Sequence, residues 1–404
     1  MRKGLLFILM CVAASGAAAK PAKVSPAELL ERARALAAEY RPAEAREQYD
    51  AYEKALARSR KQVPAEVEAE RSALVEMENM LERVEAIVVI DSLTVDSADF
   101  FRHYRLSAEA GRLVPGSVAR LPGSPMAFIP QSNTEILYAL ADSAGRYAIM
   151  GADILDDGSL DHPRDLGLDA GGGSARYPFL MPDGVTLYYA HDGDGGLGGY
   201  DIYLTRRGDD GFLQPQNVGM PYNSPYNDYL LAIDEAAGAG WWATDRNRIP
   251  GEVTIYIFVP SATRVNVDAG SEFLTSLARM GDISLTRPEG YDVEAARARI
   301  GRTGGEASGA PVADAFEIAV GSRIYRSLDD FSNRGARSAM ARAINARAAI
   351  ASARERLDGL RERYRSGDRS VEVTILNLEQ QLEDQREMYR EAVNEAIARE
   401  TGQE

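Results

Sequence analysis

The chain has 404 residues, with 46 Lys and Arg against 61 Asp and Glu, and its net charge of −15 opposes binding to the phosphate backbone of nucleic acids. Its single cysteine excludes an internal disulfide and a zinc cluster held by several thiolates. A content of 45% hydrophobic and 26% charged residues is that of an ordinary globular protein, which excludes wholesale disorder and a polytopic membrane protein.

The first residues have the order of a secretory signal peptide. Basic residues at positions 2–3 precede an apolar stretch, and Ala17, Ala18 and Ala19 form a small-residue cleavage motif. The apolar stretch is shorter than the roughly 20 residues of a membrane-spanning helix. We therefore expect residues 1–19 to be removed and the mature protein to act outside the cytoplasm. In the alternative, Cys11 is lipidated, although Met10 stands where a small residue is usual.

Residues 25–85 are expected to form a helical unit. Ser25 followed by Pro26 and Glu28 is typical of a helix start, and a break at residues 40–42 separates two helices. Their pattern resembles one tetratricopeptide-type helical hairpin, and a third helix is predicted from Pro64 to about residue 85. A single hairpin needs a neighbour to bury its apolar face. The unit is therefore either a three-helix packing unit or, less readily, a peptide-binding groove.

Residues 86–268 have the short apolar runs and Gly-rich turns of an all-β domain, which begins with β-branched strand sequence around a turn at residues 87–95. Landmarks recur at intervals of 51 to 53 residues, namely Tyr138, Tyr189 and Trp242, and Ile149, Ile202 and Ile255. A repeat of about 50 residues with short strands fits a four-stranded propeller blade. Residues 87–95 either supply a fourth blade or leave the ring incomplete.

The middle copy resembles the WD-like propeller repeat of the TolB-like families. It contains a Pro-Asp-Gly turn at 182–184, a strand ending at Tyr189 and a Gly-Gly-Tyr-Asp-Ile-Tyr strand at 198–203, although Met181 and Tyr189 replace the usual Ser and Phe. The resemblance covers about residues 124–267. It implies a propeller-type interaction platform of the Gram-negative envelope, periplasmic or associated with the outer membrane. It also implies structural roles for Pro182, Asp183, Gly184, Tyr189, Gly198, Gly199, Asp201, Ile202 and Tyr203.

Residues 269–332 are predicted to be a linker with short strands at 316–320 and 324–325, and residues 333–404 an α-helical coiled-coil hairpin. Each helix carries an apolar seam with gaps of three and four residues, and residues 366–368 separate the two helices. The seam positions are Ala343, Ala346, Ile350, Ala353, Leu357, Leu360, Tyr364, Ile375, Leu378, Leu382, Gln385, Tyr389, Ala392 and Ala396. Because alanine buries little surface, its contacts stabilise the seam only weakly. The two helices therefore either pack only on each other, or leave part of the seam open to a partner or to self-association.

The residues that usually carry catalysis are sparse. The three histidines, His103, His162 and His191, are far apart in the sequence, and no HExxH spacing is present. We therefore predict no catalytic residues, no cofactor and no enzymatic activity. The Asp- and Gly-rich segment 191–196 could wrap a calcium ion, but Asp and Gly are also the residues of hairpin turns, and it lacks the EF-hand order.

Trp241 and Trp242 are adjacent, so on a strand they point to opposite faces. We expect one in the core and the other at an edge or on the surface, where Asp245 and Arg246 would form the polar rim of a partner or ligand surface. In the alternative, both rings are core and the Asp and Arg are structural. A carbohydrate-active site there would also need two carboxylates about 5–10 Å apart.

Taken together, these patterns predict a multidomain α+β protein that combines a helical hairpin unit, an all-β propeller-type domain and a coiled-coil hairpin. Three modules of the interaction type and no catalytic set favour a non-enzymatic exported scaffold whose partners are other envelope proteins, with peripheral membrane association open. The alternative function is a carbohydrate-binding or carbohydrate-active propeller.

Overall fold

The computed structural model describes residues 24–402, apart from residues 122, 169–171, 210, 304–317, 321–322 and 326. The predicted signal peptide, including Cys11, lies outside the described residues. The chain divides between Arg71 and Ser72 into two compact units. Helices and several antiparallel sheets are both present, which confirms the α+β class.

The first unit contains helices α1 (Pro26–Ala38) and α2 (Pro42–Arg58) and the beginning of α3 (Ala65–Leu81). The predicted helix start is confirmed, because the Ser25 hydroxyl accepts a hydrogen bond of 3.2 Å from the Glu28 N–H. Glu70 of α3 accepts hydrogen bonds from Arg34 of α1 (2.8 Å) and from the Tyr49 hydroxyl of α2 (2.9 Å). These contacts favour a three-helix packing unit.

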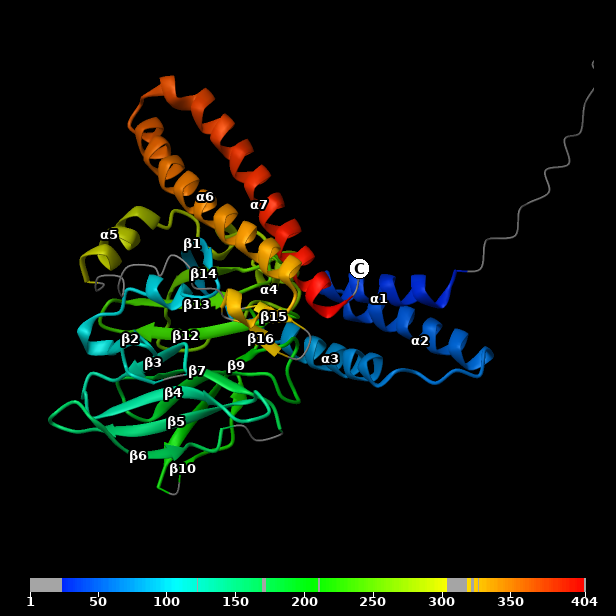
Figure 1. Cartoon of the computed structure of the whole chain (residues 1–404), viewed down its shortest axis with the longest axis horizontal. Coiled ribbons are helices and arrows are strands. Elements are labelled where there is room, and N and C mark those ends of the chain that lie inside the picture. The colour runs from blue at the N-terminus through cyan, green and yellow to red at the C-terminus, as the bar shows by residue number, and fades with distance from the viewer. Residues whose placement is uncertain are drawn as a thin grey trace, which may run out of the picture. The chain divides into compact units, whose positions relative to one another are not determined.

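The second unit contains three antiparallel sheets of four or five strands (Figure 1). The first sheet consists of β2 (Arg112–Pro115), β3 (Met126–Ile129), β4 (Glu135–Ala141), β5 (Tyr147–Ile154) and β6 (Leu160–Asp165). The second consists of β7 (Ala175–Leu180), β8 (Thr186–His191), β9 (Asp201–Gly208), β10 (Gly211–Phe212) and β11 (Gln216–Asn217). The third consists of β12 (Asp228–Asp234), β13 (Ala239–Thr244), β14 (Glu252–Val259) and β1 (Val88–Asp96).

The sequence repeat corresponds to these sheets. Its aromatic landmarks lie on β4, β8 and β13, and its isoleucine landmarks lie on β5, β9 and β14. The sheets stack in chain order, since β7 packs against β3, β4 and β5, and β12 packs against β7, β8 and β9. Phe128 and Phe179 meet between the first two sheets with their ring centroids 4.9 Å apart. Each copy of the repeat is therefore one sheet of a stack.

The prediction for residues 87–95 is wrong. Instead of two strands around a turn, the chain forms the single strand β1, which pairs with β14 as the edge of the third sheet. A register shift between Val89 and Asp91 interrupts the ladder, and this bulge is the irregularity that resembles a turn in the sequence. The strand completes the third sheet and forms no fourth blade, and no closed propeller is found in the described part of the chain.

Residues 269–332 contain more regular structure than predicted. Helices α4 (Leu274–Arg279) and α5 (Val293–Thr303) precede the hairpin of β15 (Ile318–Val320) and β16 (Arg323–Tyr325), which confirms the predicted strand pair. Short 3₁₀ helices lie in this segment at Ile283–Thr286 and Leu328–Asp330, and elsewhere in the chain at Phe100–His103, Ala108–Ala110 and Arg369–Val371. Helix α5 is too short for a clear periodic pattern, but it buries Ala296 and Ile300 in the core of the sheets.

The predicted C-terminal hairpin is confirmed as α6 (Arg334–Arg365) and α7 (Glu372–Thr401). Ten of its seam residues are buried, from Ala343 in α6 to Ala396 in α7. Arg342 and Arg361 of α6 pair with Glu395 (2.5 Å) and Glu379 (2.8 Å) of α7. At about 1.5 Å per residue, α6 is about 48 Å long. Among the helices that the structure describes, none is long and apolar enough to cross a membrane.

Candidate functional site

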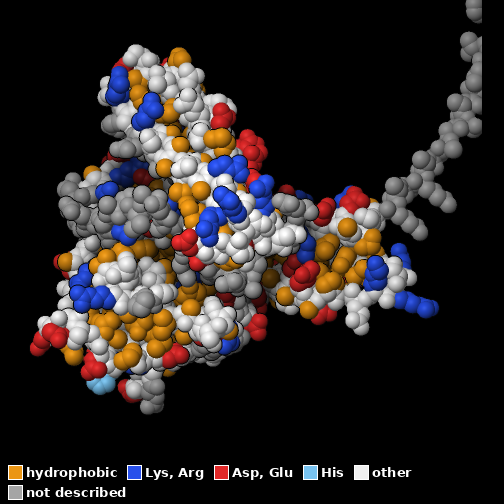
Figure 2. Space-filling model, in the orientation of Figure 1, with side chains coloured by type: hydrophobic (Ala, Val, Ile, Leu, Met, Phe, Trp, Pro, Cys, Tyr) orange, Lys and Arg blue, Asp and Glu red, His pale blue; other side chains and the backbone are white. Residues whose placement is uncertain are grey.

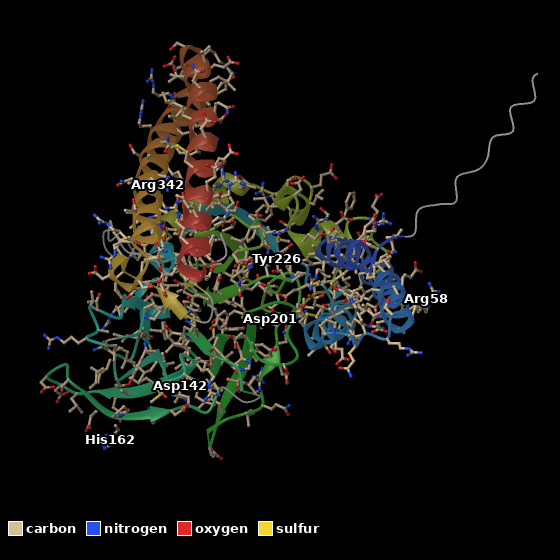
Figure 3. All side chains as sticks on the ribbon, turned by 45° about the vertical axis from the view of Figure 1, so that its right-hand side comes forward. Arg58, Asp142, His162, Asp201, Tyr226 and Arg342 are labelled. Carbon is tan, nitrogen blue, oxygen red and sulfur yellow. The ribbon has the colours of Figure 1, made fainter. Side chains whose placement is uncertain are left out.

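The Gly-Gly-Tyr-Asp-Ile-Tyr motif is held by the carboxylate of Asp201, the first residue of β9. Its Oδ2 accepts hydrogen bonds from the Leu197 N–H (2.7 Å) and from Asn217 Nδ2 (2.8 Å), and the side chain is fully buried. Burial and the nearby charge of Asp228 raise the pKa of Asp201 to about 7. Figure 3 shows Asp201 among the strands and His162 at the outer edge of the first sheet. The carboxylate therefore closes a loop and contacts no solvent.

Asp228 repeats this arrangement at the start of β12. It accepts hydrogen bonds from the N–H (2.6 Å) and the hydroxyl (2.7 Å) of Ser224. In both cases the carboxylate binds the backbone N–H of the residue four positions earlier, which is Leu197 for Asp201. Its other oxygen lies 2.9 Å from Nη2 of Arg246 in an ion pair with both side chains buried. Burial raises the pKa of Asp228, and the Arg246 guanidinium opposes that rise.

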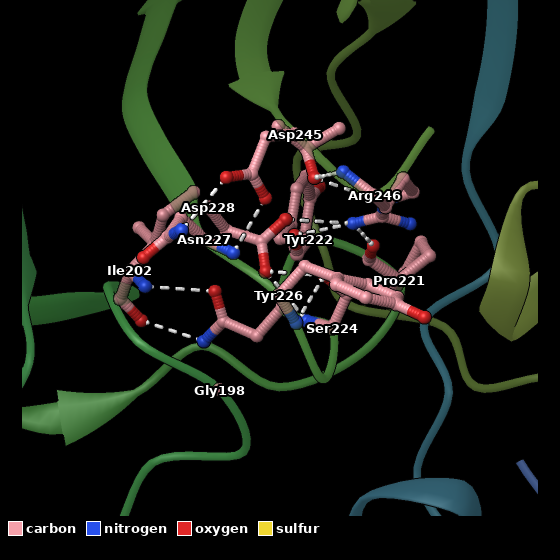
Figure 4. Close-up of polar contacts among 12 residues, drawn as sticks. Gly198, Ile202, Pro221, Tyr222, Ser224, Tyr226, Asn227, Asp228, Asp245 and Arg246 are labelled. Carbon is pink, nitrogen blue, oxygen red and sulfur yellow. Dashed lines mark hydrogen bonds and ion pairs between the residues drawn. The ribbon is translucent and has the colours of Figure 1, made fainter. Parts of the chain in front are cut away.

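Arg246 joins two loops of the domain (Figure 4). Besides its ion pair, Nη2 donates hydrogen bonds to the backbone oxygens of Pro221 (2.9 Å) and Tyr222 (2.8 Å). Its Nε donates to the Thr244 hydroxyl at 3.1 Å. Arg246 is therefore a buried structural residue, and the prediction that it lies on the rim of a ligand surface is wrong.

The side-chain amide of Asn223 binds the backbone at the start of β9. Its Oδ1 accepts a hydrogen bond from the Ile202 N–H (2.7 Å), and its Nδ2 donates to the Ile202 carbonyl (2.9 Å). The amide of Asn223 thus pairs with both backbone groups of Ile202. Because buried backbone groups are costly when unpaired, this contact stabilises the junction between the second and third sheets.

The other residues of the repeat motif also make internal contacts. Asp183 accepts hydrogen bonds from the N–H groups of Val185 and Thr186, both at 2.8 Å, and Gly184 has a φ of 69° in the turn that follows Pro182. The side chains of Tyr189, Ile202 and Tyr203 are buried, with the first and third rings 6.2 Å apart. These positions agree with the structural roles that the resemblance implies.

Glycine is required at positions 198 and 199 by close approach. A Cβ on Gly198 would lie 2.0 Å from the backbone oxygen of Tyr226, and one on Gly199 would lie 2.2 Å from Oδ1 of Asn227. The loop before β9 therefore packs directly on the loop before β12. At Gly198 no side chain fits without moving one of the two backbones, and at Gly199 a side chain would displace the Asn227 amide.

Substituting Gly198 by alanine tests this close approach. We expect the free energy of unfolding to fall by about 1–3 kcal/mol, because the new methyl group meets backbone atoms that cannot rotate away. Urea denaturation at pH 7 measures the change. G281A is the matched control, since its nearest neighbour would be the Ser276 hydroxyl at an ordinary 3.6 Å. Equal stabilities of the two variants would show that the loops are not in close contact.

The tryptophans are both core residues, so the expectation that one lies at an edge or on the surface is wrong. Trp241 is 1% exposed and packs beside Tyr104, and Trp242 is fully buried and stacks on Tyr256 with centroids 4.8 Å apart. Both faces of β13 are covered, because the third sheet lies between two hydrophobic clusters. Neither ring can stack on a sugar from solvent.

Asp245 lies apart from the tryptophans, in a cleft of about 360 Å³ at the base of the C-terminal hairpin. It accepts hydrogen bonds from the N–H (2.8 Å) and Nδ2 (2.7 Å) of Asn227. The Arg248 guanidinium lies 5.8 Å from the ring centroid of Tyr226 in the same cleft. Apolar residues of β15 and α7 complete the lining, namely Ile318, Val393 and Ile397. Its chemistry is that of non-covalent binding by aromatic, acidic and basic groups.

The Asp- and Gly-rich segment after β8 forms a turn. Asp192 accepts a hydrogen bond of 2.5 Å from the Ser174 N–H, and Nδ1 of His191 accepts one of 3.2 Å from the Gly193 N–H. Within the described ranges, no group of three or more His, Cys, Asp or Glu side chains is placed to hold a metal ion.

Several residues of the site were not predicted from the sequence, among them Asn223, Asn227 and Asp228. One signal was present, since Ser224 and Asp228 have the same spacing as Leu197 and Asp201. No family model, curated protein or solved structure matches the chain. The function is therefore inferred from the geometry of the site and the surfaces around it.

Proposed function

We propose that this protein is a non-enzymatic, exported scaffold of the cell envelope that binds other envelope proteins. The observation that carries the proposal is the C-terminal hairpin, whose outer half extends beyond the sheets (Figure 1). The resemblance of the middle repeat to TolB-like propellers supports it, as does the tetratricopeptide-like N-terminal unit. The signal-peptide pattern of residues 1–19 supports export.

The hairpin is anchored at its base and free at its tip. Arg347 of α6 pairs with Asp96 of β1 at 3.0 Å, and Tyr389 of α7 packs against Gly251, where a Cβ would lie 1.8 Å from the tyrosine hydroxyl. Beyond these contacts α6 and α7 pack mainly on each other. A long arm that adds little to the core of the sheets is suited to reach a second protein.

The outer half of α7 also exposes apolar side chains. Val373 is 67% exposed and Leu376 is 59% exposed, and they lie three residues apart on one face of the helix. Figure 2 shows hydrophobic atoms on the hairpin among basic and acidic ones. Apolar side chains that a protein leaves in solvent near the end of a projecting arm favour a partner-binding surface.

Affinity isolation from envelope fractions tests the proposal with a double variant, V373D/L376D. We expect it to recover at least ten-fold less of a specific envelope partner than the wild type, because two new charges oppose burial of the arm. The matched control V118D/L213D changes two residues of the sheet domain that are 70% and 59% exposed, and it should recover the partner normally.

Equal recovery by both double variants would contradict a role for the arm. Isolation of the chain alone at native abundance would remove the support for a scaffold of several proteins. If the only captured species is a second copy of this chain, sedimentation of the wild type and of V373D/L376D distinguishes self-association through the C-terminal helices. Circular dichroism establishes that all variants are folded.

A carbohydrate-binding function is the second candidate, and the cleft at the base of the hairpin favours it. Tyr226, Tyr229 and Asp245 line this cleft together, and tyrosine rings with a carboxylate are typical groups for holding a sugar. Screening the wild type and Y226A against envelope glycans tests it. Binding that Y226A abolishes would support this function, and no binding by the wild type would exclude it.

A further inference from the structure

A groove of about 450 Å³ runs between α6 and α7 on one side of the C-terminal hairpin. The buried seam alanines Ala346 and Ala392 line it together with Arg342. Arg342 precedes Arg347 by five residues, which is about 140° around an α-helix. Because Arg347 pairs with Asp96 at the base of the hairpin, the groove faces away from the sheets.

The two helices of the hairpin carry opposite net charges. α6 contains nine arginines and three acidic residues, a net charge of +6, and α7 contains three arginines and eight acidic residues, a net charge of −5. Pairs within the hairpin, such as Arg342 with Glu395, neutralise some of these groups. A second copy of the chain offers the complement of each helix, because its acidic α7 can face the basic α6 of the first copy.

The groove side of the hairpin carries one unpaired charge on each helix. Arg356 of α6 lies two heptads after Arg342, and Asp384 of α7 lies one heptad before Glu391, which also lines the groove. Both side chains are exposed, and neither makes an ion pair with a residue that the structure describes. Asp384 accepts only a hydrogen bond of 3.0 Å from Gln380. The two charges are therefore available to a partner.

Arg356 and Asp384 lie at the same height along the hairpin. The ion pair of Arg361 with Glu379 fixes the heights of the two antiparallel helices relative to each other. Arg356 is five residues before Arg361, and Asp384 is five residues after Glu379, so both are the same distance nearer the base. A symmetry axis that runs along the hairpin preserves height, so it can bring Arg356 of one copy to Asp384 of the other.

The same side also exposes a large and a small apolar side chain. Met388 of α7 lines the groove and is 49% exposed. Ala349, one heptad after Arg342 on α6, is exposed as well. Their heights, counted from Asp384 and Arg356, differ by three residues or about 4.5 Å. Met388 of one copy can therefore pack on Ala349 of the other, where the small side chain permits close approach of the helices.

We propose that two copies of this chain dimerise through the groove side of the hairpin, about a two-fold axis parallel to the arm. This axis places α6 of each copy beside α7 of the other, so neighbouring helices in the resulting four-helix bundle are antiparallel. Because the interface is isologous, the pair of Arg356 with Asp384 and the contact of Met388 with Ala349 each form twice.

The groove side is large enough for a reversible dimer. Two packed helices about 20 Å wide and about 30 Å long offer about 600 Å² per copy, against about 800 Å² in a standard interface. Val373 and Leu376 lie about 100° and about 150° from Met388 around α7. The dimer therefore goes beyond the scaffold function and leaves those two side chains exposed for an envelope partner.

Sedimentation equilibrium of the purified mature protein, from about 1 to about 200 µM, tests the proposal. We expect a monomer–dimer equilibrium, and a dissociation constant at least ten-fold higher for R356E and for D384R, because each variant creates two like-charge pairs. An equimolar mixture of R356E and D384R should dimerise about as tightly as the wild type, since both pairs across the mixed interface again join opposite charges.

R334E is the matched control, because Arg334 is also exposed, makes no ion pair with a described residue and lies about 100° from Arg342 around α6. It should dimerise like the wild type, and circular dichroism establishes that all variants are folded. A wild type that stays monomeric, equal dissociation constants for the wild type and R356E, or a mixture no tighter than its components would each overturn the proposal. The purified protein contains no envelope partner, so these outcomes bear on the dimer alone.

Discussion

Replacing Arg246 by methionine is expected to lower the free energy of unfolding by about 3–5 kcal/mol. The substitution leaves the fully buried Asp228 carboxylate without its cation and removes the hydrogen bonds to the Pro221 and Tyr222 carbonyls. Urea denaturation at pH 7 measures the effect through tryptophan fluorescence. Both tryptophans lie on β13, next to the affected loops, so they report directly on this region.

Two variants control this experiment. R248M removes the exposed arginine two residues further along the chain, and it should change the free energy of unfolding by no more than about 0.5 kcal/mol. D228N/R246M removes both charges, so it should recover part of the stability that R246M loses. Similar, small effects of R246M and R248M would show that the buried ion pair does not stabilise the junction of the sheets.

The second large effect is a dependence of stability on pH through Asp201. Because the pKa of this carboxyl is about 7 in the folded protein and 3.8 without perturbation, the folded state binds a proton that the unfolded state has released. Stability therefore falls as pH rises from about 4 to 7, by about 4 kcal/mol for this group at 1.36 kcal/mol per pH unit. Above pH 7 the group is ionised in both states, and the dependence ends.

The variant D201N isolates this contribution. An amide does not titrate, so the difference in free energy of unfolding between D201N and the wild type should grow in favour of D201N as the pH rises from 4 to 7. Denaturation at pH 4, 5, 6, 7 and 8 measures it. D194N, an exposed residue of the preceding loop, should give a curve parallel to the wild type. A parallel curve for D201N would contradict the shifted pKa.

Local patterns predicted the helices and the repeat. The C-terminal hairpin follows from its seam, because gaps of three and four residues place apolar side chains on one face of each helix. Ile350 of α6 and Leu378 of α7 are examples, and both are buried. The repeat was visible because the landmark residues lie on corresponding strands of the three sheets, namely β4 and β5, β8 and β9, and β13 and β14. Such features depend on neighbours within a few residues, which a single sequence contains.

Features that depend on distant neighbours were not predicted. β1 pairs with β14, about 160 residues away, and no local pattern indicates which sheet an isolated strand completes. The burial of both Trp241 and Trp242 has the same origin, since each face of β13 is covered by a different cluster. Arg246 was assigned to a surface because its partner Asp228 lies on another loop.

Photo-crosslinking from Leu376 in living cells tests the central claim, that the hairpin arm binds an envelope partner, most directly. A photoreactive phenylalanine analogue is placed at Leu376 and, as a control, at Leu213, a residue of the sheet domain with the same 59% exposure. We predict a discrete crosslinked product from Leu376 that contains an exported protein and is absent from Leu213. No product from Leu376, or the same products from both positions, would contradict the claim.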